Sequence, residues 1–154
     1  MELDFPINEP IFPIRTAAKL LNISVHTLRM YEKEGLIIPF KKDSHQRLYS
    51  KSDLERIECI RHAINEDKIS IAGIKTIYSL IPCSQILSCG ENKETCSVFK
   101  EYHKPCWMLK HVNNFCAHKD CRECVVYRSF KDCSSIKEII QEIAITNNKA
   151  NYTL

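Results

Sequence analysis

The stretch "VHTLRMYEKEGLIIPFKKDSHQRLYS", residues 25–50, decides the fold of the first half of the chain. Its opening "VHTLRMYEKE" predicts a helix with Ser24 as the N-cap and Gly35 as a left-handed stop. Leu28 and Tyr31 share one face of that helix. The rest, "LIIPFKKDSHQRLYS", gives two short extended pieces around a polar turn and predicts a β-hairpin wing.

A shorter helix is expected before this one. Thr16 can cap the segment "AAKLL", which ends near Asn22. Its apolar residues follow a partial helical period: Ala17, Leu20 and Leu21. Two short helices about four residues apart predict a helix-turn-helix.

Two scaffold helices are expected after the wing. Ser52 and Glu55 match a capping box, so the first of them should begin there. Its apolar stripe consists of Leu54, Ile57, Ile60 or Arg61, and Ile64. Ser70 opens the next helix, which Pro82 stops. The inner side of that helix carries Ile71, Ile74, Ile77 and Tyr78.

The first half is also basic. Residues 13–51 carry eight Lys and Arg against three Asp and Glu, a local net charge of +5, compared with +3 for the whole chain. Such a surface suits phosphates, and a helix-turn-helix presents the start of its second helix to base edges. The DNA-binding candidates are Arg15, Ser24, His26, Thr27, Arg29, Tyr31, Lys33, Lys41, Lys42, Arg47 and Tyr49. The alternatives are an ion pair of Arg29 with Glu32 or Glu34, and a merely solvated His26.

Three motifs in this region carry a family resemblance. "HTLRMYEKEGLIIP" followed by "RLYSKSDLERI" resembles the winged helix-turn-helix head of MerR-type transcription regulators, and "ISIAGIKTIYSL" resembles their heat-shock-repressor branch. The resemblance covers roughly residues 12–82. It implies a homodimer on double-stranded promoter DNA that affects RNA polymerase indirectly. Residues 24–33 would enter the major groove, and the hairpin around Arg47 and Tyr49 would lie against the backbone; activation and repression both stay open.

The chain departs from that family pattern at several points. The usual glycine of the wing turn is replaced by "DSHQ", and Met30 stands where an aromatic residue is frequent. The long heptad helix that many members use for dimerisation is missing after residue 82, so the dimer contact should lie elsewhere. The segment "SSIKEIIQEIAI" predicts an amphipathic helix that either packs on its own chain or dimerises. Its stripe is Ile136, Ile139, Ile140 and Ile143.

The distribution of cysteine divides the chain. Only Cys59 precedes residue 83, and the other eight cysteines lie between residues 83 and 133. We therefore expect a mainly α protein with three parts. These are a winged helix-turn-helix DNA-binding domain over 12–82, a cysteine-rich module stabilised by a metal or cluster over 83–133, and a C-terminal helix over 134–148.

The cysteine spacing favours a metal site. Cys116, Cys121 and Cys124 form C-x4-C-x2-C, and four thiolates suit either a tetrahedral Zn²⁺ or an iron–sulfur cluster. The spacing does not choose between the two cofactors. The predicted ligands are Cys106, Cys116, Cys121, Cys124 and Cys133. The more loosely spaced Cys83, Cys89 and Cys96 could add ligands, form a second site or form regulatory disulfides. His111 and His118 could each replace a thiolate, or be simply solvated.

A metal would also supply stability that this segment otherwise lacks. Few aliphatic residues recur regularly between 83 and 133, and poorly cored segments of this size commonly need a metal or cross-link. The ligand could be a structural staple alone, or it could report a signal to the DNA-binding domain.

Other classes of protein are disfavoured. No apolar run approaches the roughly 18 residues of a membrane span, and no charged-then-apolar leader opens the chain, so we expect a cytoplasmic protein with no membrane partner. No HExxH, phosphate-binding glycine loop or nucleophile elbow is present, so we do not expect an enzyme. We expect a DNA-binding transcription regulator whose cysteine module senses redox state, metal or another effector. The alternative is a DNA-binding architectural or partner-recruiting protein whose metal is purely structural.

Overall fold

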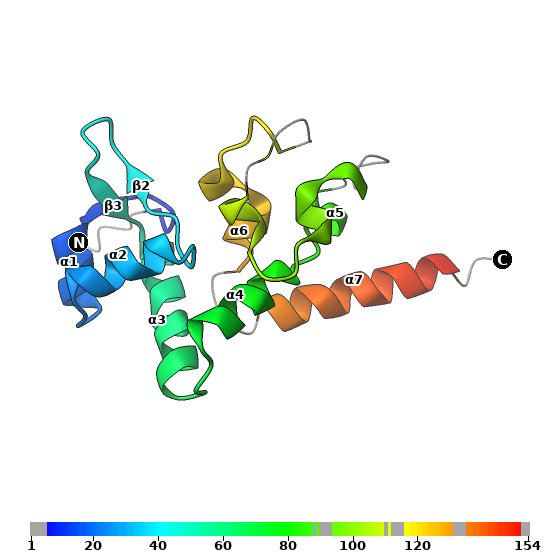
Figure 1. The fold of residues 1–154 in the computed structure, drawn as a ribbon, viewed down its shortest axis with the longest axis horizontal. Coiled ribbons are helices and arrows are strands. Elements are labelled where there is room, and N and C mark those ends of the chain that lie inside the picture. The colour runs from blue at the N-terminus through cyan, green and yellow to red at the C-terminus, as the bar shows by residue number, and fades with distance from the viewer. Residues whose placement is uncertain are drawn as a thin grey trace. The chain divides into compact units, whose positions relative to one another are not determined.

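The computed structural model describes residues 6–87, 89, 94–109, 111, 116–130 and 135–151 (Figure 1). The chain divides into two compact units, Met1–Ile71 and Ala72–Leu154. The elements up to the end of the first unit are β1 (Phe12–Pro13), α1 (Ile14–Leu20), α2 (Val25–Lys33), β2 (Phe40–Lys41), β3 (Arg47–Tyr49) and α3 (Lys51–Asn65). They are followed by α4 (Ile71–Ser79), α5 (Cys83–Ile86), the short 3-10 helices η2 (Ser97–Lys100), η3 (Cys106–Met108) and η4 (Cys121–Glu123), α6 (Val125–Arg128) and α7 (Ser135–Asn151). The mainly helical fold is as predicted.

The helix-turn-helix lies where the sequence predicts it. The hydroxyl of Ser24 caps α2 by accepting the N–H of Thr27 at 3.0 Å. Gly35 follows the helix with a φ of 73°, which only glycine adopts without steric cost. Between α1 and α2, Asn22 takes a left-handed φ of 52°. The chain therefore reverses within a short turn and presents the start of α2.

Two predicted helix starts are too late in the sequence. α1 begins at Ile14, because β1 runs directly into the helix through Pro13, and Thr16 lies inside the first turn. α3 begins at Lys51, and its capping box is made by Ser50 and Asp53. The Ser50 hydroxyl accepts the Asp53 N–H at 3.1 Å, and the Asp53 carboxylate accepts the Ser50 N–H at 2.7 Å.

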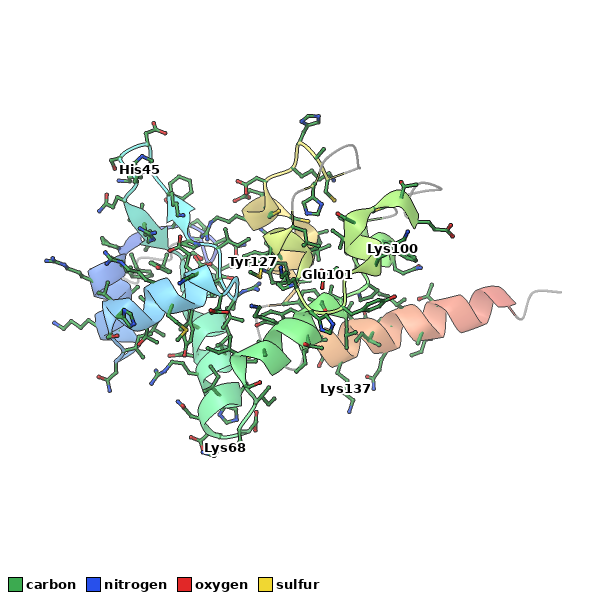
Figure 2. The ribbon with its side chains drawn as sticks, in the orientation of Figure 1. His45, Lys68, Lys100, Glu101, Tyr127 and Lys137 are labelled. Carbon is green, nitrogen blue, oxygen red and sulfur yellow. The ribbon has the colours of Figure 1, made fainter. Side chains whose placement is uncertain are left out.

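The wing is a hairpin, as predicted, with a third strand that the sequence did not reveal. The strands are antiparallel in the order β1-β3-β2, with Lys41 opposite Arg47. β1 has only two residues, too few to show the alternation that predicts a strand. At the wing tip, His45 has a φ of 62° and donates its backbone N–H to the Lys42 carbonyl at 2.8 Å (Figure 2). Thus His45 takes a conformation that suits glycine.

An apolar core holds the first unit together. Residues at most 3% exposed come from both helices of the motif, from the wing and from α3: Ala17, Leu21, Leu28, Leu36, Ile37, Tyr49, Ile57 and Ile60. The Arg61 guanidinium also donates to the Leu21 carbonyl at 2.6 Å. This bond ties α3 to the end of α1, so the scaffold helix fixes the turn that presents α2.

The second unit contains an aromatic stack. The ring of Trp107, the only tryptophan, lies 5.5 Å from that of Tyr78 and 5.2 Å from that of Tyr127, at interplanar angles of 56° and 86°. These contacts join α4, η3 and α6. On α4, Ile74 and Tyr78 are buried as predicted, but Ile77 is 37% exposed because the inward face follows a spacing of four residues.

The last helix carries its isoleucines without burying them. None of residues 135–146 of α7 is buried, and Ile140 is 42% exposed. Among the described residues, no helix has the length and apolar character required to cross a membrane.

Candidate DNA interface and candidate metal centre

The second helix of the motif separates polar and apolar residues. Its buried side carries Leu28 and Tyr31. The candidates that remain exposed on or beside it are Ser24, His26, Arg29 and Lys33, with Thr27 half-buried. The hydroxyls of Ser24 and Thr27 lie 2.9 Å apart. One face of α2 is therefore committed to the core, and the other presents hydrogen-bonding groups and cations.

A carboxylate on α2 connects the helix to the wing. Glu32 lies 2.7 Å from the Lys41 ammonium and 2.5 Å from Nε of Arg47. Lys41 on β2 and Arg47 on β3 are directly opposite each other, so their like charges would repel without the carboxylate between them. The side chain of Glu32 is only 15% exposed, whereas those of Lys41 and Arg47 are 50% and 31% exposed, so these interactions are partly shielded from water. Glu32 therefore holds both strands of the wing against the recognition helix.

The ionisation of Glu32 reflects this position. Burial opposes the charged form, but the hydrogen bonds from Arg47 and Lys41 outweigh burial, and the pKa of the carboxyl falls below 4.5. The carboxylate is therefore ionised at neutral pH. Lys41 and Arg47, predicted as phosphate contacts, are already paired within the protein.

The remaining candidates fall into two groups. Arg15, Arg29, Lys33 and Lys42 are exposed and make no ion pair with any described residue. The alternative pairing of Arg29 with Glu32 is thus not formed. Tyr31 and Tyr49 are only 5% and 0% exposed, because their rings fill the core. The Tyr49 hydroxyl has no hydrogen-bond partner among the described residues, and burial raises the pKa of this phenol. Both tyrosines therefore support the surface from beneath, and the Tyr49 hydroxyl is not presented to solvent.

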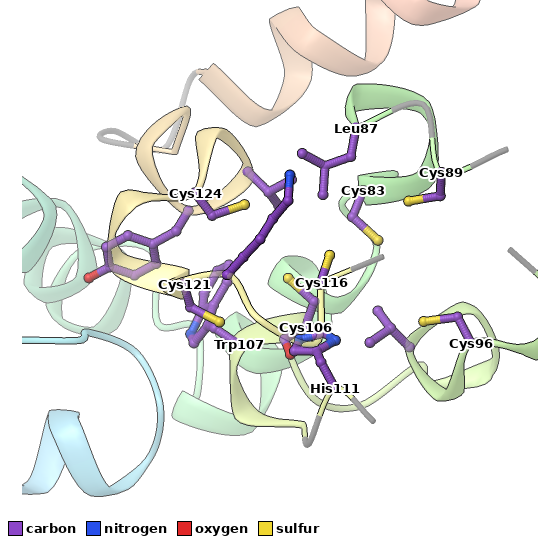
Figure 3. Close-up of a pocket in the computed structure, with 14 residues that line it drawn as sticks. Cys83, Leu87, Cys89, Cys96, Cys106, Trp107, His111, Cys116, Cys121 and Cys124 are labelled. Atoms are coloured by element: carbon purple, nitrogen blue, oxygen red, sulfur yellow. The ribbon is translucent and has the colours of Figure 1, made fainter. Parts of the chain in front are cut away.

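In the second unit, one cavity collects the thiols. Its lining includes all seven cysteines that are described in this unit: Cys83, Cys89, Cys96, Cys106, Cys116, Cys121 and Cys124. Figure 3 shows their sulfur atoms directed toward a common space from several separate segments. Four of the five predicted ligands are therefore brought together with all three of the loosely spaced cysteines. Cys133 lies outside the described residues.

The thiols lie close enough to influence one another electrostatically. Burial, and then the proximity of Cys89, Cys96 and Cys116, raise the pKa of Cys83 to about 11. Burial likewise raises the pKa of Cys106, with further contributions from Cys83, Cys121, Cys124 and Cys116. At neutral pH these two groups are protonated in the absence of a cation. A metal ion would therefore displace protons from these thiols as it binds.

The two histidine candidates differ. His111 lines the thiol cavity, and its Nε2 lies 2.9 Å from the Cys106 carbonyl. His118 is exposed and does not belong to the lining. The imidazole of His111 is therefore near the thiols, but its Nε2 is engaged by the backbone.

The donor set fits a thiophilic metal, although the thiols do not converge on a single point. Thiolate ligands select zinc, copper(I) and iron–sulfur clusters. Across the described residues, no three Cys, His, Asp or Glu side chains are arranged to hold one metal ion. The thiols surround a cavity of about 40 Å³ lined also by Leu87, Val98 and Val126. The chemistry of the wall thus suits a soft metal, and the described arrangement is wider than one coordination sphere.

The fold and surface of the first unit define a winged helix-turn-helix protein. The family model described as MerR HTH family regulatory protein matches residues 12–80. A protein of Haemophilus influenzae, named a probable heavy metal-dependent transcriptional regulator, is 32% identical over 73% of this chain and 94% of its own length. The chain therefore belongs to the MerR family and is a transcription regulator.

Other relatives match mainly the DNA-binding head. A protein of Streptomyces coelicolor named as heat shock protein HspR is 34% identical over 46% of this chain, and the transcriptional regulator ZntR of Escherichia coli is 30% identical over 54%. The chain spans about half the length of these two relatives, 47% and 59% respectively. The named regulators among the relatives are not enzymes, which confirms that expectation for this chain.

Proposed function

We propose that this protein is a homodimeric promoter-binding regulator whose DNA affinity responds to a metal or to redox state at the thiol cavity. The observation that carries the DNA-binding part is the exposed face of α2, with Ser24, His26 and Arg29 beside a wing held in place by Glu32. In this proposal α2 enters the major groove, and the cations on and beside it contact phosphates. RNA polymerase is affected indirectly, through the promoter.

The DNA-binding part is tested on an operator duplex selected from a random pool. Arg29→Ala should weaken binding by about tenfold or more, because a base contact is worth about 1–3 kcal/mol and a phosphate contact adds about one to the salt slope. Lys68→Gln is the control, since Lys68 is an exposed cation at the far end of α3, where it donates to the Asn65 carbonyl. Equal affinities of the Arg29 and Lys68 variants would remove the proposed docking.

The dimer contact is assigned to α7. Four of its five isoleucines, Ile136, Ile139, Ile140 and Ile143, recur at three- and four-residue spacing along one side of the helix, and none of residues 135–146 is buried within the chain. Half-buried Ile139 and Ile143 sit in the middle of that side. Unpartnered apolar faces of this kind favour association with a second copy.

Sedimentation measures this contact. Ile139→Lys combined with Ile143→Lys should give monomers that keep the helical circular dichroism of the parent. Gln141→Lys adds charge to an exposed position on another side of α7 and should leave the dimer intact. A dimeric double-lysine variant would place the interface elsewhere.

The sensory part is supported by the position of Trp107. Trp107 follows Cys106 in the sequence and packs against the ring of Tyr127, and both of these residues line the thiol cavity. Trp107 also packs against Tyr78 of α4. Since α4 lies within the family match, a change in the cavity reaches the last helix of the matched region through one aromatic contact. The similarity to a protein named as heavy metal-dependent agrees with a metal as the effector.

A further inference from the structure

We propose that the thiol cavity holds a polynuclear centre, with at least two metal ions bridged by sulfur, and not a single zinc ion. This inference rests on the metal-binding part of the proposed function. It concerns only what the cavity contains. The DNA-binding surface of the first unit does not enter into it.

The number of donors is the first argument. One tetrahedral ion uses four ligands, whereas seven described cysteines line this one cavity. Cys106, Cys116, Cys121 and Cys124 would already complete a single site. Cys83, Cys89 and Cys96 would then line the same cavity without binding that ion.

The space between the donors is the second argument. In a single zinc site the distance from the ion to each of four sulfur atoms is about 2.3 Å, so the sulfur atoms leave no space for any further atom between them. Here the cavity measures about 40 Å³, while one water needs about 10–15 Å³. In the described residues no three donors converge as a single ion requires. The cavity therefore has room for several atoms, as bridging sulfur and more than one metal ion would require.

The character of the wall is the third argument. Besides sulfur, the lining carries Leu87, Val98, Val126 and the aromatic rings of Trp107 and Tyr127. Among the described residues, Lys119 is the only Lys or Arg in the lining. The described part of the wall contains no carboxylate for a hard cation, so a metal–sulfur centre is the ligand whose polarity it matches.

The experiment counts metal and sulfide in the full-length chain purified without oxygen. One sample is analysed as isolated, and others after loading with ferrous iron plus sulfide or with Zn²⁺ alone. Two or more metal ions per chain support the proposal when they form one centre, either as iron with acid-labile sulfide and visible absorption or as zinc ions that are lost together from Cys83→Ser. Two zinc ions that are lost independently would be two mononuclear sites and would overturn it. One tightly bound ion per chain overturns it.

A cysteine outside the four-residue set sharpens the test. Cys83→Ser should lower the metal count or alter the absorption of the loaded protein, because Cys83 takes part in a shared centre. Ser84→Ala, at the next position of α5 and outside the lining, is the matched control. If Cys83→Ser retains the parental count and spectrum, Cys83 is no ligand, the cysteines of this cavity do not share one centre, and the proposal is wrong.

The outcome is separable from the failure of the wider function. Operator binding of the same samples is measured in parallel. A protein with one ion and metal-dependent operator binding would reject the polynuclear centre and keep the sensor. A protein with two or more ions whose operator binding does not respond to metal would support the polynuclear centre and reject the sensor. A chain that binds no metal at all would reject both, while promoter binding by the first unit would stand.

Discussion

The interior of the first unit is filled by aliphatic and aromatic side chains, whereas seven thiols surround the cavity of the second. In the first unit, side chains such as Leu28, Leu36 and Ile57 are completely buried, and two helices carry side-chain caps. In the second unit, α5 and α6 and the η helices have only three or four residues each. A conventional core stabilises one unit, and we propose that a bound ligand stabilises the other.

In the proposed function, this difference in stabilisation gives the two units different tasks. Apolar burial gives the DNA-binding unit a shape that does not depend on the composition of the cell. A unit that depends on a metal has a population of folded molecules that follows the supply of that metal. A regulator needs both properties, since its reading head must stay constant while its sensor changes.

Metal removal should have the largest effect and should act on the second unit alone. Structural zinc contributes on the order of 10 kcal/mol in small peptides, so a chelator under reducing conditions should unfold the cysteine region. The fluorescence of Trp107, which lines the cavity, should shift toward that of a solvated indole. Calorimetry should retain the unfolding transition of the first unit. Unchanged fluorescence after complete metal removal would show that the second unit has a sufficient core of its own.

A core substitution should destabilise the first unit and leave the second unit unchanged. Leu28→Ala removes a fully buried side chain from α2, and such changes cost about 2–5 kcal/mol. Operator binding should fall with the stability of the first unit, whereas the metal content should not change. Leu20→Ala on α1, where the leucine is 57% exposed, is the matched control and should have little effect on melting. Loss of metal from the Leu28 variant would mean that the two units do not fold independently.

Glu32→Gln should affect specificity more than stability. Losing the interactions with Arg47 and Lys41 should cost about 1–2 kcal/mol of folding free energy, because these are partly exposed charged hydrogen bonds. Removal of a negative charge would by itself tighten DNA binding. Because the wing would also lose its position, we expect about tenfold weaker operator binding, with binding to random DNA unchanged or tighter.

Two controls accompany this variant. Glu58→Gln removes an exposed carboxylate of α3 and should leave the ratio of operator to random binding unchanged. Because the pKa of Glu32 is lowered in the folded protein, its stabilising contribution is complete above the ordinary value of 4.5 and is lost as the pH falls through the folded value. The difference in melting temperature between parent and variant should therefore shrink in acid. A constant difference down to low pH would contradict the role of the ionised carboxylate.

The smallest effect is expected at the wing tip. A left-handed conformation costs a non-glycine residue about 1–2 kcal/mol, and glycine loses about 0.5–1 kcal/mol through its greater freedom in the unfolded chain. Since His45 has a φ of 62°, His45→Gly should stabilise the first unit by about 0.5 kcal/mol. Gln46→Gly, at a neighbouring position without a positive φ, should destabilise it. Denaturant unfolding can measure both changes, and equal effects of the two would refute the strain argument.

The first unit was predictable because its determinants are local. The cap at Ser24 and the stop at Gly35 lie within one turn of the helix that they delimit, and both were visible in the sequence. The start of α3 was misplaced because Ser52 and Glu55 fit the same motif as the actual pair, Ser50 and Asp53. Only the end of β3 at Tyr49 distinguishes the two, and it depends on strand pairing.

For the candidate sites, the sequence indicated the residue types but not their arrangement in space. Cysteine spacing indicated a metal site, but it did not show that Cys83, Cys89 and Cys96 would line the same cavity as the later cysteines. The pairing of Glu32 with Arg47 joins residues fifteen positions apart, and no periodicity marks it. The stack of Trp107 on Tyr78 and Tyr127 is likewise a tertiary contact. Such features depend on packing between elements, which a single sequence does not display.

We propose that the thiol cavity controls the affinity of the winged head for its operator. The most direct test compares the operator dissociation constants of the metal-loaded and metal-free protein at one ionic strength, with random DNA as the reference. The account predicts that loading changes operator affinity by about tenfold or more, corresponding to a coupling of about 1.4 kcal/mol, while random binding stays constant. Equal operator affinities for the two forms, with a shift in thermal stability alone, would contradict it and would make the metal purely structural.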